Sequence, residues 1–402
     1  MYTILKAKTD GLKDEAFSFA QELVQTPSPS GQEGRVAQTV ASRMRALRYD
    51  LVVEDDFGNV LGLLRGEKDG PKVLLSTHLD TIKAGAGWSD DPFSGRVANG
   101  LLHGLGAGDC KAGIAAHVYA GALLKRSLLP LAGDLLVAAT VGEENSYSVG
   151  IRGLLQKTLN ELEMKPAYAI LGEPTDLGLY YGHDGWFEAD VVIEGTNPFM
   201  VEDAAKAVFR ELDASRQKEV EELLVAEPQS ENAQELRRSR IGVSRRLHAS
   251  EEIGAVLKQL HRHAALVTQT VGAVVVDVQV RENPQRLYNG KDIVVRHITH
   301  AWDTGPFDPL MERARHALEA ASCEVRPGKW RLGRMGMGTA GGVLRNEFQI
   351  PTIGYGPGNE ELVHAPNESV ELSKLATCIY GTASIVHSLI GIPLFGWTTD
   401  DI

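Results

Sequence analysis

Short apolar runs alternate with helical patterns along the first half of the chain. The runs that predict strands are residues 51–53, 60–64, 73–75, 135–141 and 167–171. Residues 112–128 are apolar on most faces, which is typical of a helix that packs on a sheet. Strands that alternate with helices predict an α/β fold, a mostly parallel sheet with helices on both faces. Ligands of such sheets bind beyond the carboxyl ends of the strands.

The pattern changes near residue 183. The elements predicted there are strands at 187–193, 271–280 and 293–298 and helices at 201–225 and 253–260. The polar, charge-rich residues 229–246 predict a solvated helix or a mobile excursion. The α/β pattern resumes with a helix at 309–321, a strand at 350–354 and a helix at 372–389. We therefore predict a discontinuous main domain (1–182 and 302–402) with an inserted α+β domain at 183–301.

Composition narrows the class of protein. The chain has 402 residues, 43% of them hydrophobic and 23% charged, which is ordinary for a globular protein. The formal net charge of −12 argues against a nucleic-acid partner, since phosphates would be repelled. No apolar run approaches the roughly 18 residues of a membrane span. The three cysteines lie far apart and the first residues lack a secretory signal, so we expect a cytoplasmic protein without a membrane partner.

Two polar clusters occur early in the chain. His78 and Asp80 follow the run 73–75, and a His with an acid two residues on either binds a metal or forms a structural ion pair. Asp109 ends the glycine-rich run 104–109. This spacing does not suit a dinucleotide, because Asp109 would lie where the pyrophosphate binds. The glycines either let Asp109 approach a cation or form a tight turn with a capping Asp.

Three more clusters carry acids or a histidine. Glu143 and Glu144 follow the fourth predicted strand, where adjacent carboxylates repel unless a cation or a proton separates them. Glu173 follows the fifth strand, and Pro174 holds it in an extended turn. His364 lies in a loop near the C-terminus. Taken singly, each cluster is also compatible with an ordinary turn or a solvated loop.

Together the clusters indicate one site. The residues that would meet at the same edge of one sheet are His78, Asp109, Glu144, Glu173 and His364. Two imidazoles and three carboxylates suit a pair of Zn²⁺-like ions, with one carboxylate bridging them. A single binuclear site is therefore a simpler explanation than several unrelated turns.

In this order, the motifs resemble the cocatalytic zinc peptidase family, which includes glutamate carboxypeptidase, succinyl-diaminopimelate desuccinylase, acetylornithine deacetylase and the aminoacylases. The stretches that carry the resemblance are STHLDT, GLGAGDCKAGIAA, TVGEENSYSVGIRGL, AILGEPTDL and GYGPGNEELVHAPNES. The resemblance covers the predicted main domain, about residues 1–182 and 302–402, and leaves room for the family's inserted lid at 183–301. The resemblance implies a metal-dependent hydrolase that cleaves an amide bond in a small N-acyl amino acid or short peptide.

The resemblance also implies a ligand set. His78 and Glu173 would hold one divalent metal, Glu144 and His364 the other, and Asp109 would bridge them. Zn²⁺ is the expected metal, although Co²⁺ or Mn²⁺ would accept the same ligands. Two such ions lower the pKa of water and polarise a carbonyl.

The resemblance also implies roles for residues beside the ligands. Asp80 would orient His78, and Glu143 would be the general base that takes a proton from the metal-bridging water and passes it to the leaving amine. Cys110, beside the bridging acid, is either a thiolate ligand or a small buried residue. The second reading is favoured, because its neighbours already complete the ligand set.

The inserted domain departs from the family. Relatives carry an oxyanion-stabilising His in a Gly-x-x-x-His-x-x-x-Pro stretch of the lid, but the corresponding residues 194–200 contain none. His183, His248 and His300 do not match that motif and are predicted to be loop or surface residues.

A second departure lies in the glycine-rich run 336–342. Relatives carry an acid after its Thr339, where this chain has Ala340. The run could instead receive a substrate carboxylate at the start of a helix, and Arg334 is a weaker candidate for the same task.

Alternatives to the deacylase remain open. One is a dipeptidase or carboxypeptidase of the same family. Another is a non-catalytic metal-binding relict, suggested by the missing lid His, although retention of Glu143 argues against it. The expected partners are a small-molecule or short-peptide substrate and a second copy of the chain. The amphipathic helix at 253–260 could form such a homodimer through the lid, or could simply be buried within it.

Overall fold

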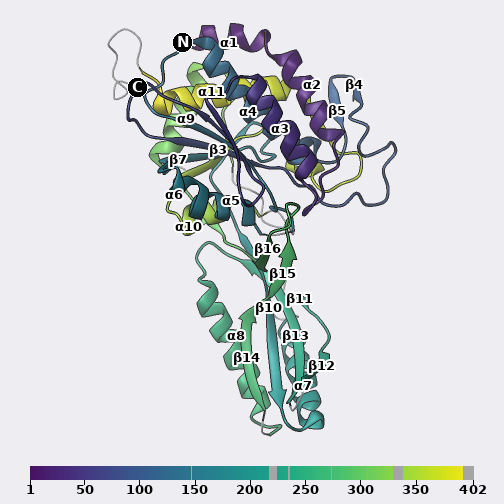
Figure 1. The fold of residues 1–402 in the computed structure, drawn as a ribbon. Coiled ribbons are helices and arrows are strands. Elements are labelled where there is room, and N and C mark those ends of the chain that lie inside the picture. Colours follow the sequence, from purple (N-terminus) through teal and green to yellow (C-terminus); the bar gives the residue numbers. More distant parts are fainter. Residues whose placement is uncertain are drawn as a thin grey trace.

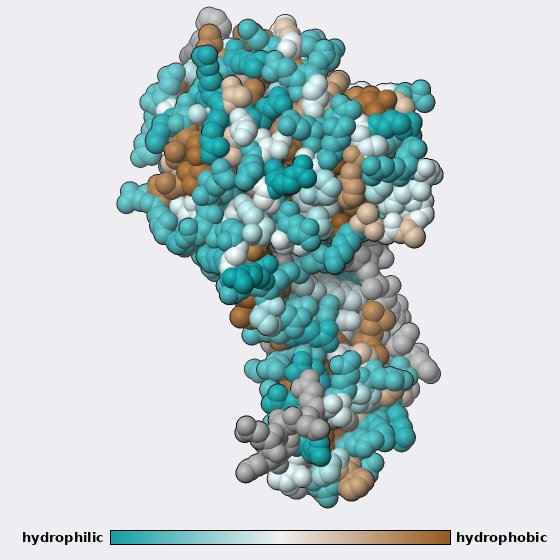
Figure 2. Space-filling view, turned by 45° about the vertical axis from the view of Figure 1, so that its right-hand side comes forward, coloured by the Kyte–Doolittle hydropathy of each residue, from teal (hydrophilic) through white to brown (hydrophobic). Residues whose placement is uncertain are grey.

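The structure is a computed structural model that describes residues 1–145, 147–216, 224–233, 236–272, 274–305, 307–328 and 338–392. A broad body carries a narrower lobe (Figure 1). The two lobes are also visible in the space-filling view, where hydrophilic residues cover most of the exposed face and hydrophobic areas are small and separate (Figure 2). None of the helices in the described ranges combines the length and apolar character needed to span a bilayer.

The body is built on one eight-stranded sheet. Strands β6, β3, β7 and β20 are consecutive parallel neighbours, and β1 and β2 extend one edge antiparallel. This confirms the predicted α/β class with a parallel-containing sheet. In spatial order the strands are β1 (Leu51–Glu54), β2 (Val60–Leu64), β6 (Leu135–Thr140), β3 (Val73–His78), β7 (Tyr168–Leu171), β20 (Thr352–Gly354), β8 (Gly178–Tyr180) and β19 (Arg326–Gly328).

Helices cover both faces of this sheet (Figure 1). In β3, Val73 and Leu75 pack into one apolar core and Leu74 packs into the other. The helices of the first core are α1 (Tyr2–Asp10), α2 (Lys13–Val24), α3 (Gly34–Ala46), α4 (Ala112–Ser127), α9 (Pro309–Ala320) and α11 (Leu372–Ile390). Those of the second are α5 (Val149–Gly153), η2 (Leu154–Thr158), α6 (Leu159–Glu161) and α10 (Gly341–Asn346).

The narrower lobe contains a second sheet, in the order β11-β13-β10-β14. Helices α7 (Pro198–Arg216) and α8 (Ile253–Thr268) pack with its buried side chains into a third core. Its strands are β10 (Gly185–Gly195), β11 (Leu224–Val225), β12 (Gln229–Ala233), β13 (Leu236–Leu247), β14 (Val275–Val280) and β17 (Ile298–Thr299).

The prediction for residues 229–246 was wrong. They contain β12 and most of β13, which pairs with β10 along its whole length. Alternate residues of β13 such as Ile241 and Val243 are buried, which is the period of a strand. At the alternate positions, Arg238 and Arg240 pair with acids of β10, and these charged residues hid the alternation in the sequence. Of the helix predicted at 201–225, the described residues to Arg216 belong to α7 and residues 224–225 form a strand, while residues 217–223 lie outside the described residues.

A hairpin from the inserted segment returns to the body. It consists of β15 (Glu282–Arg286) and β16 (Asp292–Arg296). The Tyr288 hydroxyl donates to the Gly58 carbonyl (3.1 Å), and Lys291 Nζ lies 3.6 Å from the centre of the Phe57 ring. The two chain crossings between the lobes pair as β9 (Gly182–His183) and β18 (Trp302–Asp303). The narrower lobe is therefore fastened to the body at two places.

Candidate metal centre

His78 is the last residue of β3 and is almost fully buried. Its Nδ1 lies 2.8 Å from the backbone carbonyl of Asp80 and 3.5 Å from the Asp80 carboxylate. The carbonyl, rather than the expected carboxylate, is thus the nearer group that orients the ring. His78 Nε2 is left to face Asp109 Oδ1 at 3.1 Å and Glu173 Oε2 at 3.8 Å.

The Asp80 carboxylate instead organises the loop that carries the paired acids. It accepts the backbone N–H groups of Glu143 and Glu144, both at 3.0 Å, and the Ser30 hydroxyl at 2.6 Å. Burial works to raise the pKa of Asp80, but these hydrogen bonds and His78 outweigh it, so the pKa lies below its usual value. Asp80 therefore stays ionised and fixes the positions of both glutamates.

Asp109 is held by an acid that the sequence did not single out. Glu368 accepts the backbone N–H groups of Gly106 (2.8 Å), Gly108 (2.7 Å) and Asp109 (3.0 Å) across about 260 residues of chain. A small sheet of β4 (Val97–Ala98), β5 (Leu101–His103) and β21 (Ser369–Glu371) brings the two segments together. The peptide bond between Asp109 and Cys110 is cis, and η1 (Ala107–Lys111) leads into α4.

The two oxygens of Asp109 face different histidines. Oδ1 lies 3.1 Å from His78 Nε2, and Oδ2 lies 3.5 Å from His364 Nε2. His364 Nε2 is also 3.0 Å from Glu144 Oε1. Ligand atoms within 4.8 Å of one another form two groups that share Asp109: one with His78, Cys110 and Glu173, the other with Glu144 and His364. The structure therefore brings together all five sequence-predicted ligands.

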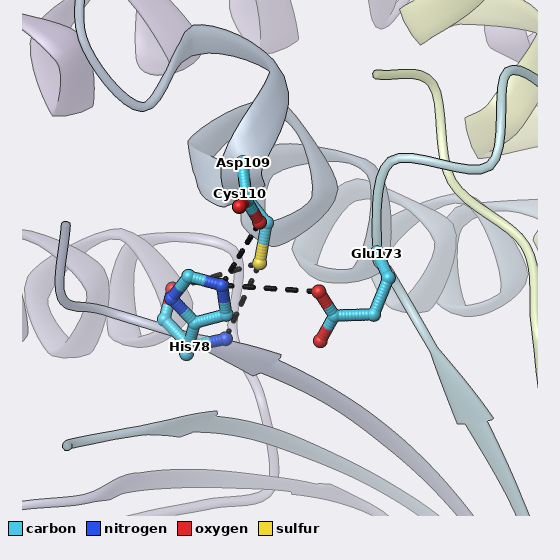
Figure 3. Close-up of side chains that lie close together, drawn as sticks. All are labelled: His78, Asp109, Cys110 and Glu173. Carbon is cyan, nitrogen blue, oxygen red and sulfur yellow. Dashed lines mark hydrogen bonds and ion pairs between the residues drawn. The ribbon is translucent and has the colours of Figure 1, made fainter. Parts of the chain in front are cut away.

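Figure 3 shows the first group, with the side chains of His78, Asp109, Cys110 and Glu173 directed toward a common space. Cys110 is completely buried, and burial raises the pKa of its thiol far above the usual range. A neutral thiol is a poor ligand, so the small-residue reading of Cys110 fits better than a thiolate ligand.

The cluster contains more carboxyl groups than its two imidazoles can neutralise. Burial raises the pKa of Glu173 well above its usual range; His78 offsets part of this, and the charges of neighbouring acids add to it. Burial likewise raises the pKa of Glu144, with His364 opposing, and raises that of Glu143 to about 8. Buried carboxylates that cannot all ionise together are the environment that divalent cations stabilise, and two imidazoles with three carboxylates are a donor set suited to Zn²⁺. The residues present fit a pair of metal ions.

A cavity of about 400 Å³ lies over this cluster, between the body and the narrower lobe. Its floor includes Glu143, which belongs to neither ligand group, and the Ser148 hydroxyl donates to Glu143 Oε1 at 2.8 Å. The side chains and backbone that complete the walls are Tyr147, Trp186, Glu188, Leu224, Ser244, Thr299, Gly338 and Thr339.

His183 is buried, which corrects its prediction as a loop or surface residue. Its Nδ1 donates to the Asp184 carbonyl (2.6 Å), while its Nε2 accepts the backbone N–H of Thr339 (3.0 Å) and lies 2.8 Å from the Thr339 hydroxyl. The Thr339 N–H is therefore engaged and does not point at a substrate carboxylate. His248 is partly exposed and contacts Asp184 at 3.0 Å, and His300 is half-buried.

The structure describes part of the two segments in which the sequence departs from the family. Residues 194–200, which lack the lid His, span the end of β10 and the start of α7, where Asn197 accepts the N–H of Phe199. Arg334 and residues 336–337 of the glycine-rich run lie outside the described residues.

An α/β body with this paired donor set at its sheet edge, beneath a second lobe, belongs to the class of binuclear metallohydrolases. The sequence profile of Peptidase family M20/M25/M40 matches residues 74–388, and the chain belongs to that family of metal-dependent hydrolases acting on amide bonds.

The chain is also similar to individual proteins. The chain is 26% identical to the uncharacterized protein YgeY of Escherichia coli (strain K12), over 96% of each chain. It is 30% identical to a succinyl-diaminopimelate desuccinylase of Gluconacetobacter diazotrophicus, over 45% of this chain and 49% of that protein. Its fold is similar to that of Bacillus subtilis YXEP, a dinuclear metal binding peptidase, with a TM-score of 0.68, 14% identity and coverage of 94% and 98%.

Proposed function

We propose that this protein hydrolyses the amide bond of a small N-acyl amino acid or short peptide, with Glu143 as general base. The observation that carries the proposal is the placement of Asp109, whose two oxygens face His78 and His364 from one buried side chain. That arrangement suits a carboxylate that bridges two cations, here proposed to be Zn²⁺.

The ligands divide between the two sites. His78 and Glu173 would hold one ion, Glu144 and His364 the other, and Asp109 both. Bound there, two divalent ions supply a low-pKa water and polarise the scissile carbonyl. The chain itself fixes the geometry, because Asp80 and Glu368 hold the backbone of both ligand loops.

Glu143 is placed to move the proton. It lines the cavity floor beside the ligands, yet is not one of the ligand atoms grouped around either site. Its carboxylate accepts the Ser148 hydroxyl through Oε1. Glu143 would take the proton of the attacking water and deliver it to the leaving amine, a task that contributes roughly 10²–10⁴-fold to rate.

The names of two relatives support the proposed substrate class. The desuccinylase named above and a Bacillus subtilis N-formyl-4-amino-5-aminomethyl-2-methylpyrimidine deformylase, 28% identical over 48% of this chain, are named for removing acyl groups. A dipeptidase would instead require a free amino group. A panel of N-acetyl, N-succinyl and N-formyl compounds against dipeptides separates the two activities.

Two variants test the mechanism. We expect Glu143→Ala to retain two metal ions per chain and to lose roughly 10²–10⁴-fold in kcat. His364→Ala should lose close to one ion per chain by elemental analysis. Wild-type hydrolysis by the Glu143 variant would refute the base, and unaltered metal content in the His364 variant would refute the ligand set. If the wild-type protein binds metal but hydrolyses no compound of the substrate panel, the result would favour the non-catalytic metal-binding relict.

Residues 183–301 would act as the lid, and a second copy of the chain would bind at its edge. Strand β14 pairs with β10 on one side, while its other edge has no strand partner in the described part of the chain. Val275 is 67% exposed on this strand. An open strand edge with an exposed apolar side chain favours antiparallel pairing between copies. Sedimentation velocity should show a dimer that Val275→Glu dissociates; a monomeric wild-type protein would contradict this.

A further inference from the structure

Tyr147 and Ser148, the two residues that precede α5, lie between the candidate metal centre and the lid. Their φ angles are 50° and 60°. This left-handed region is unfavourable for residues other than glycine, and consecutive examples persist only where surrounding contacts impose them. The contacts of these two residues show what the loop conformation achieves.

Ser148 contacts the proposed base rather than its own helix. It occupies the N-cap position of α5, where a serine side chain ordinarily accepts a backbone N–H. Here it makes no such bond, and its hydroxyl donates to Glu143 Oε1 at 2.8 Å. Ser148 is 3% exposed, so water does not compete for this hydrogen bond. The helix forgoes a cap, and the Glu143 carboxylate gains a fixed orientation.

Tyr147 contacts the lid. Its hydroxyl donates to Glu188 Oε1 of β10 at 3.1 Å, and its ring centre lies 4.8 Å from that of His297. Glu188 is itself held, because Arg281 Nη1 donates to its other oxygen at 2.5 Å. We call Glu188, Arg281 and His297 the lid socket. All three belong to the inserted segment, so the position of Tyr147 depends on where the lid lies.

The backbone of Tyr147 is tied to the body. Its carbonyl accepts a hydrogen bond from Arg152 Nη1 (3.3 Å), and Arg152 forms a bidentate ion pair with Glu347. The loop is thus anchored at its C-terminal end, and the tyrosine ring extends from that anchor into the lid socket. A shift of the lid would move the Tyr147 side chain and, through the backbone, the adjacent Ser148.

We propose that Tyr147 and Ser148 are positioning residues that couple the lid to Glu143, so that the carboxylate is aligned for proton transfer only when the lid socket holds Tyr147. This inference rests on the proposed function, since it requires Glu143 to be the base. It assigns the lid a part in catalysis that does not need the histidine missing from residues 194–200.

The test compares two tyrosine hydroxyls that both join the lobes. Tyr147→Phe removes the bond to Glu188, and Tyr288→Phe, the matched control, removes the bond between the hairpin and Gly58. With the metal-loaded enzyme, we expect Tyr147→Phe to lower kcat about ten-fold with KM changed less than about two-fold. Tyr288→Phe should leave kcat unchanged. Both variants should keep the wild-type metal content.

Ser148 completes the test. Ser148→Gly, which tolerates the left-handed backbone, should lower kcat at least as much as Tyr147→Phe. The double variant should be no slower than the slower single variant, because both act through one carboxylate.

Several results would overturn the coupling: wild-type kcat in Tyr147→Phe, multiplicative losses in the double variant, or an equal loss in Tyr288→Phe. Measuring Glu143→Ala in the same experiment distinguishes a failure of the coupling from a failure of the proposed base. If it is inactive while Tyr147→Phe is unaffected, only the coupling fails; if it is active, the proposed base fails and the coupling fails with it.

Discussion

The two sheets of this molecule use polar residues in opposite ways. Strands β3 and β6 of the body are buried along their whole length on both faces. In strand β10 of the lid, apolar side chains pack with the lid helices on one face, while the acids Glu188, Asp190 and Glu194 lie on the other face among arginines. In a doubly covered strand a polar residue is tolerated chiefly at the end, so polar residues there mark a site. On an open sheet face the same residues mark solvation and ion pairing.

The charge balance differs in the same way. On the lid face acids are matched by bases: Arg281 holds Glu188 and Asp190, and Arg238 holds Glu194. At the body edge the acids outnumber the bases, and burial raises the pKa of Glu144 and Glu173. The unmatched cluster is the one that a cation would stabilise, and among the described residues the candidate ligand groups lie at this edge of the body.

The largest expected effect is at the body edge. Glu368→Gln replaces one of the acceptor oxygens that hold the Asp109 loop with an NH₂ donor, so at least one buried N–H loses its partner. We expect metal affinity to fall roughly 10–100-fold, measured by titration of the metal-free protein. Glu371→Gln, a half-exposed acid three residues on, is the control and should bind metal normally. Equal affinities in both variants would show that the loop does not depend on Glu368.

The corresponding change in the lid should affect stability and leave metal content intact. Asp190 is 3% exposed and its removal leaves Arg281 without that partner. We expect Asp190→Ala to lower the free energy of unfolding by about 1–3 kcal/mol in urea titrations. Glu194→Ala, on the same strand but more exposed, should cost less than about 1 kcal/mol. Loss of metal from the Asp190 variant would show that metal binding at the body edge depends on the ion pairs of the lid.

The effect that is smallest at neutral pH concerns a polar residue inside the body. His117 of α4 is completely buried, neither ring nitrogen has a hydrogen-bond partner, and burial lowers its pKa to about 3. The folded state keeps this ring neutral, whereas in the unfolded chain the ring takes up a proton below about pH 6.5. Protonation therefore stabilises the unfolded chain alone, and the free energy of unfolding falls as the pH falls.

The measurement is the pH dependence of unfolding. Between about pH 6 and pH 4, wild-type protein should lose roughly 1.4 kcal/mol per pH unit relative to His117→Leu, both in chelator. His263→Gln, an exposed histidine of α8, should follow the wild type. Parallel curves for the wild type and His117→Leu would mean that the ring is hydrated or paired in solution.

Much of the body could be predicted from the sequence. The strands β2, β3, β6 and β7 appear as apolar runs because both of their faces are covered, and the helix at 112–128 is apolar because it is buried. The lid was harder: the arginines of β13 pair with acids of β10 that lie about 45 residues away, so the sequence shows charge where the structure has a paired strand.

The sequence by itself indicated which side chains could hold a metal, because His78, Glu144 and Glu173 end or follow buried strands that meet at one edge of a parallel sheet. Only the tertiary structure decided how they are held: that Asp109 faces both histidines, that Glu368 supports its loop, and that Tyr147 reaches the lid. These contacts join segments that are distant in the chain and depend on distances of a few ångströms, which hydrophobic periodicity does not encode.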